Sequence, residues 1–242
     1  MENIQISAKV IGKMSMPDFC PRCFWIGLKC KPLPWQIFPG IFNTIDAYTK
    51  KIVHQWIDRE DGKPDFLKEY GVTGYQKAPH WKKFRFDAGH GITLSGMADD
   101  IWNVEGGIVI PDYKTAKYTA NADKLLPMYS TQLNGYAKIA EGIGMGPVVG
   151  IPLIYMEPQT DDGAVELDGR HETLFKMAFL PHVLKIDLDP DSLDPLLERA
   201  RKIYDGPMPL GADGCKDCKA LEGILDQLAS EGLYYYADGK GD

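Results

Sequence analysis

Two acidic residues, a lysine and a glutamine–tyrosine pair occur close together in residues 94–136. Asp112 follows Asp99 by thirteen positions, and Lys114 stands two residues after Asp112. Side chains two apart on a strand point to the same side, so we expect Asp112 and Lys114 to share one face. Carboxylates bind hard divalent cations, and a neighbouring lysine can orient water or stabilise charge on a phosphate. This pattern is what metal-assisted hydrolysis needs, although an isolated Asp-x-Lys on a strand is more often a surface charge pair.

Two strands and a helix must position these groups. The segments ITLSGMADDIWNV and GGIVIPDYKTA favour strands, and the Gly-Gly between them predicts a hairpin turn at residues 105–107. We expect the hairpin to bring Asp99 and Asp112 to one end of a sheet. Tyr113 then points away, with its backbone carbonyl available to a cation. A helix over residues 127–142 would carry Gln132 and Tyr136, four positions apart.

The rest of the chain alternates between helical and extended patterns. Apolar spacing predicts a helix over residues 43–58, and Asp-Pro-Asp opens another over residues 188–204. Strands are expected at residues 148–157 and 173–182. We therefore predict an α/β fold, with one domain over residues 1–242 and a central mixed sheet flanked by helices. Residues 15–30 and 211–222 would form a small lobe beside it.

The motif residues resemble the PD-(D/E)XK nuclease superfamily, and in particular its RecB-like branch. The resemblance rests on Gly96 to Asp99, the hairpin, Asp112-Tyr113-Lys114, and Gln132 with Tyr136. The branch includes CRISPR-associated exonucleases and the nuclease domains of helicase–nuclease complexes. It implies a restriction-endonuclease-like core, a Mg²⁺ or Mn²⁺ cofactor, and hydrolysis of DNA at ends or in single strands.

The same resemblance implies roles for individual residues. Asp99, Asp112 and the Tyr113 carbonyl would hold the metal, with Asp100 on the opposite face. Lys114 would be the catalytic lysine, and Gln132 and Tyr136 would position DNA or Lys114. Many RecB-like members have a further histidine ligand on a helix before the sheet, and here that helix offers Asp46 and His54. Either residue remains a candidate ligand, and each is also compatible with a solvated helix surface.

Five cysteines lie near the two ends of the chain. Cys20 and Cys23 form one C-x2-C pair and Cys215 and Cys218 another, a pattern more typical of metal binding than of disulfides. The CPRCFWI segment resembles RecB-like nucleases in which an iron–sulfur cluster clamps the chain ends together. We therefore expect a [4Fe–4S] cluster, with structural zinc as the alternative. Cys30 is left over, and we expect it to be a buried thiol.

Charge and hydropathy restrict the classes of partner. A net charge of −7 argues against a protein that coats nucleic acid by bulk electrostatics, but it allows an enzyme with a local basic patch. No apolar run approaches the ~20 residues of a membrane helix, and the first residues lack a signal-peptide pattern, so we expect a cytoplasmic protein. The candidate DNA-binding residues, which could equally be a solvated strand face, are Trp81, Lys82, Lys83 and Arg85.

Aromatic residues around this basic segment suggest single-strand binding. Tyr75, Trp81, Phe84 and Phe86 could stack on unpaired bases. The alternative function is a nuclease-fold subunit that binds nucleic acid or another nucleic-acid-processing protein, in an integration, repair or phage complex, with little or no cleavage. The acidic net charge and the missing standard histidine motivate this alternative.

Overall fold

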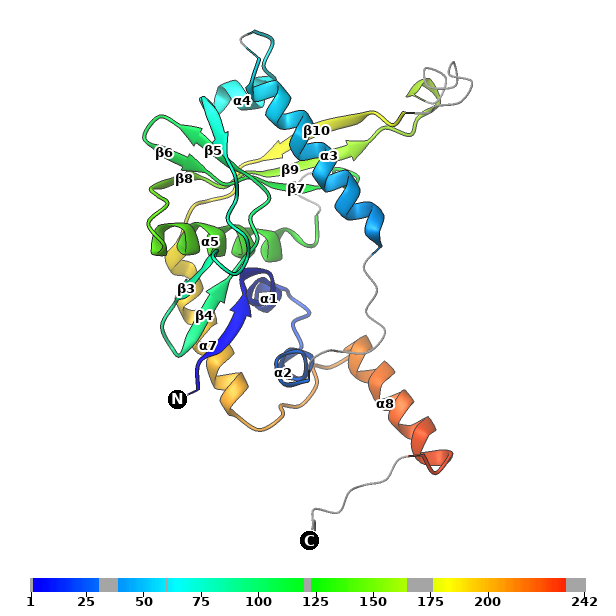
Figure 1. The fold of residues 1–242 in the computed structure, drawn as a ribbon. Helices are drawn as coiled ribbons and strands as arrows, with labels where there is room; N and C mark the ends of the chain where they lie inside the picture. Colours follow the sequence, from blue (N-terminus) through cyan, green and yellow to red (C-terminus); the bar gives the residue numbers. More distant parts are fainter. Residues whose placement is uncertain (1, 31–38, 60, 120–122, 165–175, 234–242) are drawn as a thin grey trace. The chain divides into compact units, whose positions relative to one another are not determined.

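The protein has a mixed α/β structure with strands in three sheets flanked by helices (Figure 1). The computed structural model describes residues 2–30, 39–59, 61–119, 123–164 and 176–233. The chain forms two compact units, residues 1–16 with 36–198 and residues 17–35 with 199–242. The fold class agrees with the sequence prediction. The second unit extends beyond the expected lobe because it also includes residues 199–210.

Most strands of the first unit form one run of mixed sheet. These strands are β2 (Gly74–Gln76), β5 (Ile101–Val104), β6 (Gly107–Val109), β7 (Asp112–Lys114), β8 (Val148–Gly150), β9 (Leu153–Pro158) and β10 (Phe179–Leu184). One ladder has the order β2-β5-β6-β8 and the next has the order β7-β9-β10. The β6–β8 and β7–β9 pairs are parallel, and the remaining pairs are antiparallel.

Two prolines separate the ladders. Pro111 lies between β6 and β7, and Pro152 lies between β8 and β9. Proline has no backbone N–H and cannot donate to a ladder. Backbone hydrogen bonds nevertheless continue across the gap: Ile110 N donates to Gly150 O at 2.9 Å, and Asp112 N donates to Pro152 O at 3.0 Å. The two ladders are therefore one sheet interrupted at the prolines.

The predicted hairpin is present, but it does not carry both acids. β5 and β6 pair across a turn in which Gly106 has φ of 82°, a conformation that favours glycine. Asp99 precedes β5, whereas Asp112 begins β7 beyond the hairpin. The expectation that the acids lie on the two strands of one hairpin was wrong, because Pro111 ends β6 and a new strand begins after it.

A smaller sheet places the start of the chain beside the candidate site. Its strands are β1 (Ile4–Ser7), β4 (Ile92–Ser95) and β3 (Arg85–Asp87), with β1 parallel to β4 and β4 antiparallel to β3. The Ser7 hydroxyl accepts a hydrogen bond from Val10 N at 3.3 Å and caps α1 (Ala8–Gly12). A 3₁₀ turn over Lys13–Ser15 follows.

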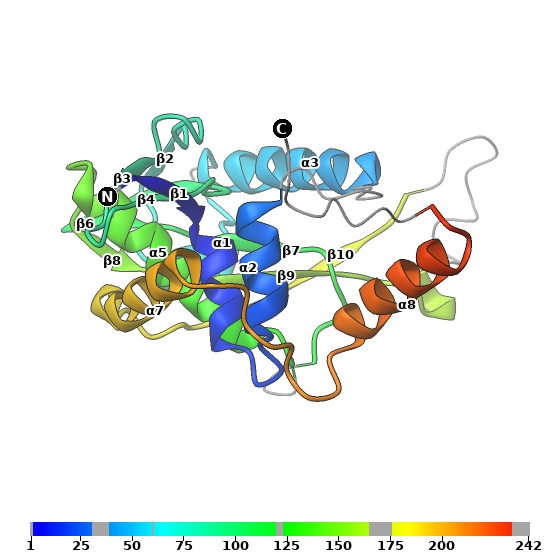
Figure 2. The same cartoon turned by 90° about the horizontal axis from the view of Figure 1, so that it is seen from below.

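Helix α5 (Leu126–Gly142) is the most deeply buried helix among those described. Leu133, Ala137 and Ala140 are fully enclosed, and α1 packs along it (Figure 2). The approach is close, since a Cβ atom at Gly135 would lie 2.6 Å from the Ala8 Cβ. The helix predicted at residues 127–142 is thus confirmed, and its central residues are packed between other elements.

Helix α3 (Gly40–Ile57) has one buried side and one exposed side. Val53 and Ile57 pack into a cluster with Trp102 and Ile154, and Figure 1 shows α3 crossing in front of β9 and β10. The helix begins three residues before the predicted start at residue 43. Ile41 and Tyr48 are exposed. The buried side therefore anchors the helix and leaves its other residues free for the cavity described below.

The remaining helices complete both units. They are α2 (Pro21–Lys29), α4 (Asp65–Glu69), the 3₁₀ turn Pro190–Leu193, α7 (Asp194–Asp205) and α8 (Lys216–Ser230). The helix predicted over residues 188–204 is thus divided into a 3₁₀ turn and α7. Of the strand predicted at residues 173–182, residues 173–175 lie outside the described residues, and β10 begins at Phe179.

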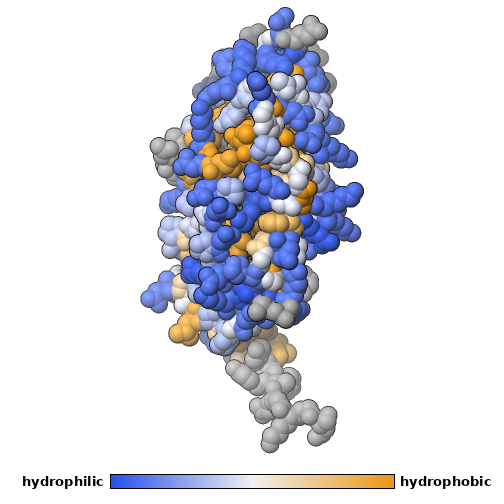
Figure 3. Space-filling model, turned by 90° about the vertical axis from the view of Figure 1, so that its left-hand side faces the viewer, coloured by the Kyte–Doolittle hydropathy of each residue, from blue (hydrophilic) through white to orange (hydrophobic). Residues whose placement is uncertain are grey.

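Hydrophilic side chains dominate the face shown in Figure 3, with hydrophobic residues in small patches between them. Among the described residues, no helix combines the length and the apolar character needed to cross a membrane.

The contact between α1 and α5 gives a test of the fold. Gly135→Ala should lower the free energy of unfolding by about 1–3 kcal/mol, because the added methyl group overlaps Ala8. Urea denaturation measures the change. Gly40→Ala is the matched control: a Cβ there has no described neighbour within 4 Å, so stability should stay the same or rise slightly. Equal stability of the two variants would contradict the packing described.

Candidate active site and cysteine cluster

The sequence-predicted acids and the lysine line one cavity. Its volume is about 710 Å³, and it lies among α3, the segment before β5, β7 and α5. The predicted residues on its wall are Asp46, Asp99, Asp112, Tyr113, Lys114, Gln132, Tyr136 and Trp81. The fold therefore brings together residues that are up to 90 positions apart in the chain.

Asp112 is a buried carboxylate at the start of β7. Its Oδ1 accepts a hydrogen bond from Gln132 Nε2 at 3.1 Å, and its Oδ2 forms an ion pair with the Lys114 ammonium group. Lys114 is the partner of Oδ2 among the described residues. Burial raises the pKa of Asp112 to about 6, the charge of Asp99 adds to this, and Lys114 opposes it. A cation at Oδ2 would relieve this unfavourable burial of charge.

Lys114 remains a cation in this environment. Burial opposes its charge, but the neighbouring Asp112 and Asp99 outweigh that effect and raise the pKa of Lys114 above its usual value. The ammonium group also lies 4.8 Å from the centroid of the Tyr129 ring. A lysine that stays protonated cannot accept a proton from water. It can instead hold water in place or stabilise negative charge on a phosphate.

Asp99 is held by contacts to both of its oxygens. Oδ2 accepts a hydrogen bond from Tyr113 N at 2.9 Å, which joins Asp99 to the strand that carries Asp112. Oδ1 lies 3.4 Å from Lys50 Nζ, and the same ammonium group donates to Asp46 Oδ2 at 2.8 Å. Sequence reasoning missed Lys50. The spacing of four residues between Asp46 and Lys50 on a predicted helix was the available signal.

The neighbouring carboxylate, Asp100, belongs to a separate buried network. It accepts hydrogen bonds from Trp102 Nε1 at 3.2 Å and from the Tyr113 hydroxyl at 3.0 Å. His54 Nε2 lies 3.0 Å from both Asp100 oxygens, and its ring stacks on Tyr75 at 3.7 Å. Asp46 lines the cavity, whereas no described contact joins His54 to Asp99 or Asp112. Of the two candidate residues on this helix, only Asp46 lines the cavity, where it pairs with Lys50.

Gln132 and Tyr136 form a second layer behind Asp112. Gln132 Nε2 donates to the Tyr136 hydroxyl at 2.7 Å as well as to Asp112. Gln132 Oε1 is buried and accepts no hydrogen bond from the described residues. A Cβ at Gly96 would lie 2.7 Å from the Tyr136 ring, so only glycine admits the ring at this position. Gly96 is therefore required because the Tyr136 ring occupies the space that a larger side chain would fill.

The residues of the expected nucleic-acid-binding segment point to different parts of the structure. Trp81 is 40% exposed and lines the cavity, with the Lys82 ammonium group 5.6 Å from its ring centroid. Arg85 instead donates to Gln5 on the small sheet at 3.4 Å. Lys83 is exposed. The local basic segment therefore does not form a single surface facing the cavity.

Some of the residues expected to stack on bases are wrongly assigned. Phe84 is fully buried and packs edge-on against Tyr136, so it cannot stack on a base. Phe86 is half-buried on β3, and Tyr75 already stacks on His54. Sequence reasoning also missed two apolar residues on the cavity wall, Phe42 and Met97, which are 45% and 64% exposed. Nothing in their local sequence pattern distinguishes them from ordinary surface residues.

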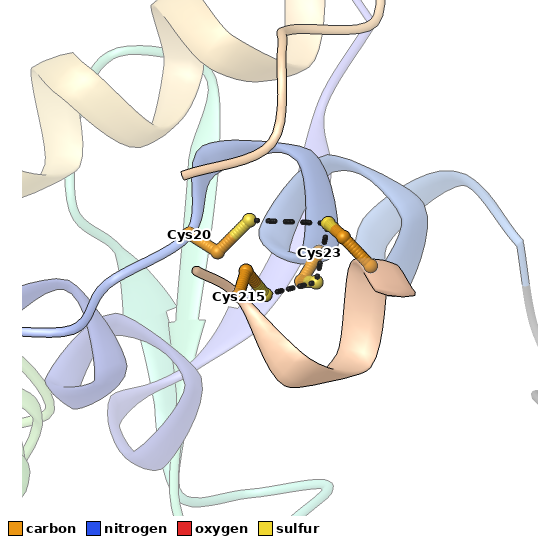
Figure 4. A group of neighbouring side chains, drawn as sticks. Cys20, Cys23 and Cys215 are labelled. Carbon is orange, nitrogen blue, oxygen red and sulfur yellow. Dashed lines mark hydrogen bonds between the residues drawn. The ribbon is translucent and has the colours of Figure 1, made fainter. Parts of the chain in front are cut away.

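Four cysteines form a cluster in the second unit. The sulfur atoms of Cys20, Cys23, Cys215 and Cys218 lie within 4.8 Å of one another. Cys23 Sγ is 3.6 Å from Cys215 Sγ and 3.5 Å from Cys218 Sγ, and Cys20 Sγ is 3.6 Å from Cys218 Sγ. Figure 4 shows the side chains converging from the first turns of two helices. This arrangement can hold a metal, as the two C-x2-C pairs predicted.

The starts of α2 and α8 create a suitable setting for thiolates. Cys20 and Cys215 occupy the residue before each helix, where backbone N–H groups have no intrahelical partner. Burial disfavours ionisation of Cys20. Hydrogen bonds from the backbone of Ala212 and Cys23 and from neighbouring thiols outweigh that effect and lower its pKa to about 6. Burial raises the pKa of Cys218 to about 11 and also raises that of Cys23, so among these three thiols only Cys20 is shifted towards the thiolate.

Cys30 was predicted to be a buried thiol, and that prediction was wrong. The residue is exposed, one position beyond the last residue of α2.

Comparison with known proteins adds no functional information. No protein-family model and no curated protein matches this sequence. The crystal structure of SSO0001 aligns with 86% of this chain and 80% of its own, with a TM-score of 0.36 and 13% sequence identity. Similarity at this level carries no argument about fold or activity. The chemistry must therefore be argued from the contacts themselves.

The burial of Asp112 predicts a pH dependence of stability. Its pKa is about 6 in the folded chain against an ordinary 3.8, so its contribution is fully present below about pH 4 and is lost as the pH rises through 6. The Asp112→Asn variant has no carboxyl group to ionise at this position, so its free energy of unfolding does not fall in this way. In EDTA, the free energy of unfolding of the variant relative to wild type should rise by about 3 kcal/mol between pH 4 and pH 8.

Urea denaturation across this pH range tests the expectation. Asp65→Asn is the control, because the Asp65 side chain is fully exposed. A constant difference between Asp112→Asn and wild type over the whole range would contradict the buried, weakly acidic Asp112.

Proposed function

We propose that this protein is a metal-dependent nuclease that hydrolyses DNA phosphodiesters, with Mg²⁺ or Mn²⁺ held by Asp99 and Asp112. One observation carries the proposal: two carboxylates and a permanently charged lysine face the same cavity, with Gln132 and Tyr136 packed behind Asp112. This set also agrees with the motif resemblance to RecB-like PD-(D/E)XK nucleases. A structural ion pair alone would not require a cavity of this size beside it.

The donor set fits a divalent cation. Oδ1 of Asp99 and Oδ2 of Asp112 are hard oxygen donors, and neither accepts the backbone or amide hydrogen bond that holds the other oxygen of its carboxylate. The Tyr113 carbonyl would be a further ligand. When bound, the cation supplies Lewis-acid stabilisation of charge on the phosphate and lowers the pKa of a water.

The protein side chains supply the remaining functions. Lys114 keeps its charge beside Asp112 and stabilises the negative charge that develops on the phosphate oxygens. Gln132 orients Asp112 through a single hydrogen bond to Oδ1, which leaves Oδ2 facing Lys114. Tyr136 holds Gln132 in that position. Each of these residues therefore acts on Asp112 or on the phosphate rather than removing a proton from water.

The apolar part of the cavity wall supports action on DNA ends or single strands. Phe42, Trp81 and Met97 are substantially exposed there, although large apolar side chains are usually buried. Unpaired bases can stack on such residues, whereas bases within a duplex are already stacked on one another. The net charge of −7 also favours a local contact over an extended basic surface.

The second candidate function is a nuclease-fold subunit that binds nucleic acid or a partner protein with little cleavage. One observation favours it: the Lys50 ammonium group lies against Asp99, at the oxygen that would face the metal. The cleavage experiment below separates the two candidates.

Cleavage should depend on Mn²⁺ and on the cavity residues. Lys114→Met and Asp112→Asn should each lower the rate of cleavage of labelled single-stranded DNA by about 10²- to 10³-fold, because the first removes charge stabilisation at the phosphate and the second removes a ligand of the cation. Lys68→Met is a matched control, since Lys68 pairs with Asp65 on the surface and does not line the cavity. Tight DNA binding without Mn²⁺-dependent cleavage by the wild type would instead support the binding subunit.

The sulfur spacing bears on the metal of the cysteine cluster. A tetrahedral zinc ion with Zn–S distances of about 2.3 Å holds its sulfurs about 3.8 Å apart. Three sulfur–sulfur contacts, of 3.5 and 3.6 Å, are close to this value, and all four sulfurs lie within 4.8 Å of one another. A four-iron cluster binds each cysteine through a different iron, so it requires wider spacing. The geometry thus supports zinc, the alternative to the [4Fe–4S] cluster that the sequence resemblance favours.

Anaerobic purification followed by metal analysis tests this assignment. We expect a colourless protein with one zinc per chain and no iron. Cys20→Ser combined with Cys218→Ser should lose the zinc, whereas Cys30→Ser should keep it, because Cys30 lies outside the cluster. A brown protein that absorbs near ~400 nm would establish the iron–sulfur cluster in place of zinc.

A further inference from the structure

Lys50 lies between two carboxylates at the edge of the candidate metal site. Its Nζ donates to Asp46 Oδ2 at 2.8 Å and lies 3.4 Å from Asp99 Oδ1. The Lys50 side chain is only 26% exposed and that of Asp99 only 19%. The contact with Asp99 is therefore largely shielded from water, whereas the Asp46 side chain is 40% exposed. A charge interaction shielded from water is stronger than one at an open surface.

The two contacts of Lys50 have different consequences for the metal site, because of how Asp99 is held. Asp99 Oδ2 is occupied by the backbone N–H of Tyr113 at 2.9 Å. Oδ1 is therefore the oxygen left for a divalent cation, and it is the same oxygen that Lys50 approaches. An ammonium group and a divalent cation repel each other, so Lys50 at this oxygen weakens binding of the cation there. The Asp46 carboxylate gives Lys50 a second position.

The local charge balance supports competition rather than coexistence. Three carboxylates, Asp46, Asp99 and Asp112, face two ammonium groups, Lys50 and Lys114. Lys9, which also lines the cavity and acts on Asp112, adds a third positive charge, so these groups together leave no excess negative charge to retain a doubly charged ion. Because the lysine side chain has four flexible carbons, Lys50 can leave Asp99 without movement of the helix.

We propose that Lys50 is a built-in counter-ion that competes with the divalent cation for Asp99, and that Asp46 draws it away when the cation binds. This inference rests on the proposed metal site. Lys50 thereby sets the affinity for the cation, and Asp46 acts through Lys50 rather than as a ligand. In the empty site, Lys50 neutralises Asp99, and in the loaded site it pairs with Asp46 alone.

Mn²⁺ affinity, measured by the electron paramagnetic resonance signal of free Mn²⁺, tests the proposal on the full chain. Lys50→Met should bind Mn²⁺ about tenfold more tightly than wild type, because it removes the competing charge and keeps the side-chain length. Asp46→Asn should bind more weakly, since Lys50 then has only Asp99 as a partner. The double variant should resemble Lys50→Met. Lys51→Met, at an exposed position on the same helix, should behave as wild type.

Each contrary result has a definite meaning. Both Lys50→Met and Lys50→Gln could bind Mn²⁺ as weakly as wild type or more weakly, with an intact near-ultraviolet circular dichroism spectrum. That result would contradict the proposed counter-ion role of Lys50 without contradicting the metal site. A double variant that binds more weakly than Lys50→Met would overturn the role of Asp46 and identify it as a ligand. If neither wild type nor Lys50→Met binds Mn²⁺, the proposed function itself fails.

Discussion

The burial of one carboxylate determines much of the structure around the cavity. Asp112 enters the sheet directly after Pro111, and its charge is surrounded by Lys114, Gln132 and Asp99. Burial of an ionised group is unfavourable unless it is paired and hydrogen-bonded. The second layer of Gln132 and Tyr136 can be understood as the support that such a group requires. Helix α5 is then deeply buried because it must deliver this support from inside the core.

Much of the candidate site could be predicted because its residues recur at short, regular spacings. Asp112 and Lys114 share a strand face, and Gln132 and Tyr136 share a helix face, so local periodicity identifies each pair. Asp99 is less accessible to such reasoning, since its position depends on a hydrogen bond to Tyr113 rather than on a shared strand. The mixed α/β class followed from the alternation of helical and extended patterns. The interruption of the sheet at Pro111 and Pro152 could not be predicted from these patterns.

The misassignments have a common physical origin in tertiary packing. Phe84 has the same local pattern as an exposed aromatic residue, but Tyr136 from a distant helix covers it. Lys50 resembles a surface lysine until α3 is placed beside the segment that carries Asp99. Cys30 is exposed, one position beyond the last residue of a helix. For Phe84 and Lys50, the deciding contact joins residues that sequence periodicity cannot relate.

The interruption of the sheet at Pro111 and Pro152 has a consequence for the evolution of the motif. The β5–β6 hairpin lies between Asp99 and Asp112, yet its tip at Gly106 is an exposed turn remote from the ladder of β7 and β9. Insertions or deletions at that tip would leave Asp112 anchored to Pro152 and Asp99 anchored to Tyr113. The number of residues between the two acids is therefore free to drift, whereas the interval from Pro111 to Lys114 is not. Searches for related chains should weight the second interval and allow the first to vary.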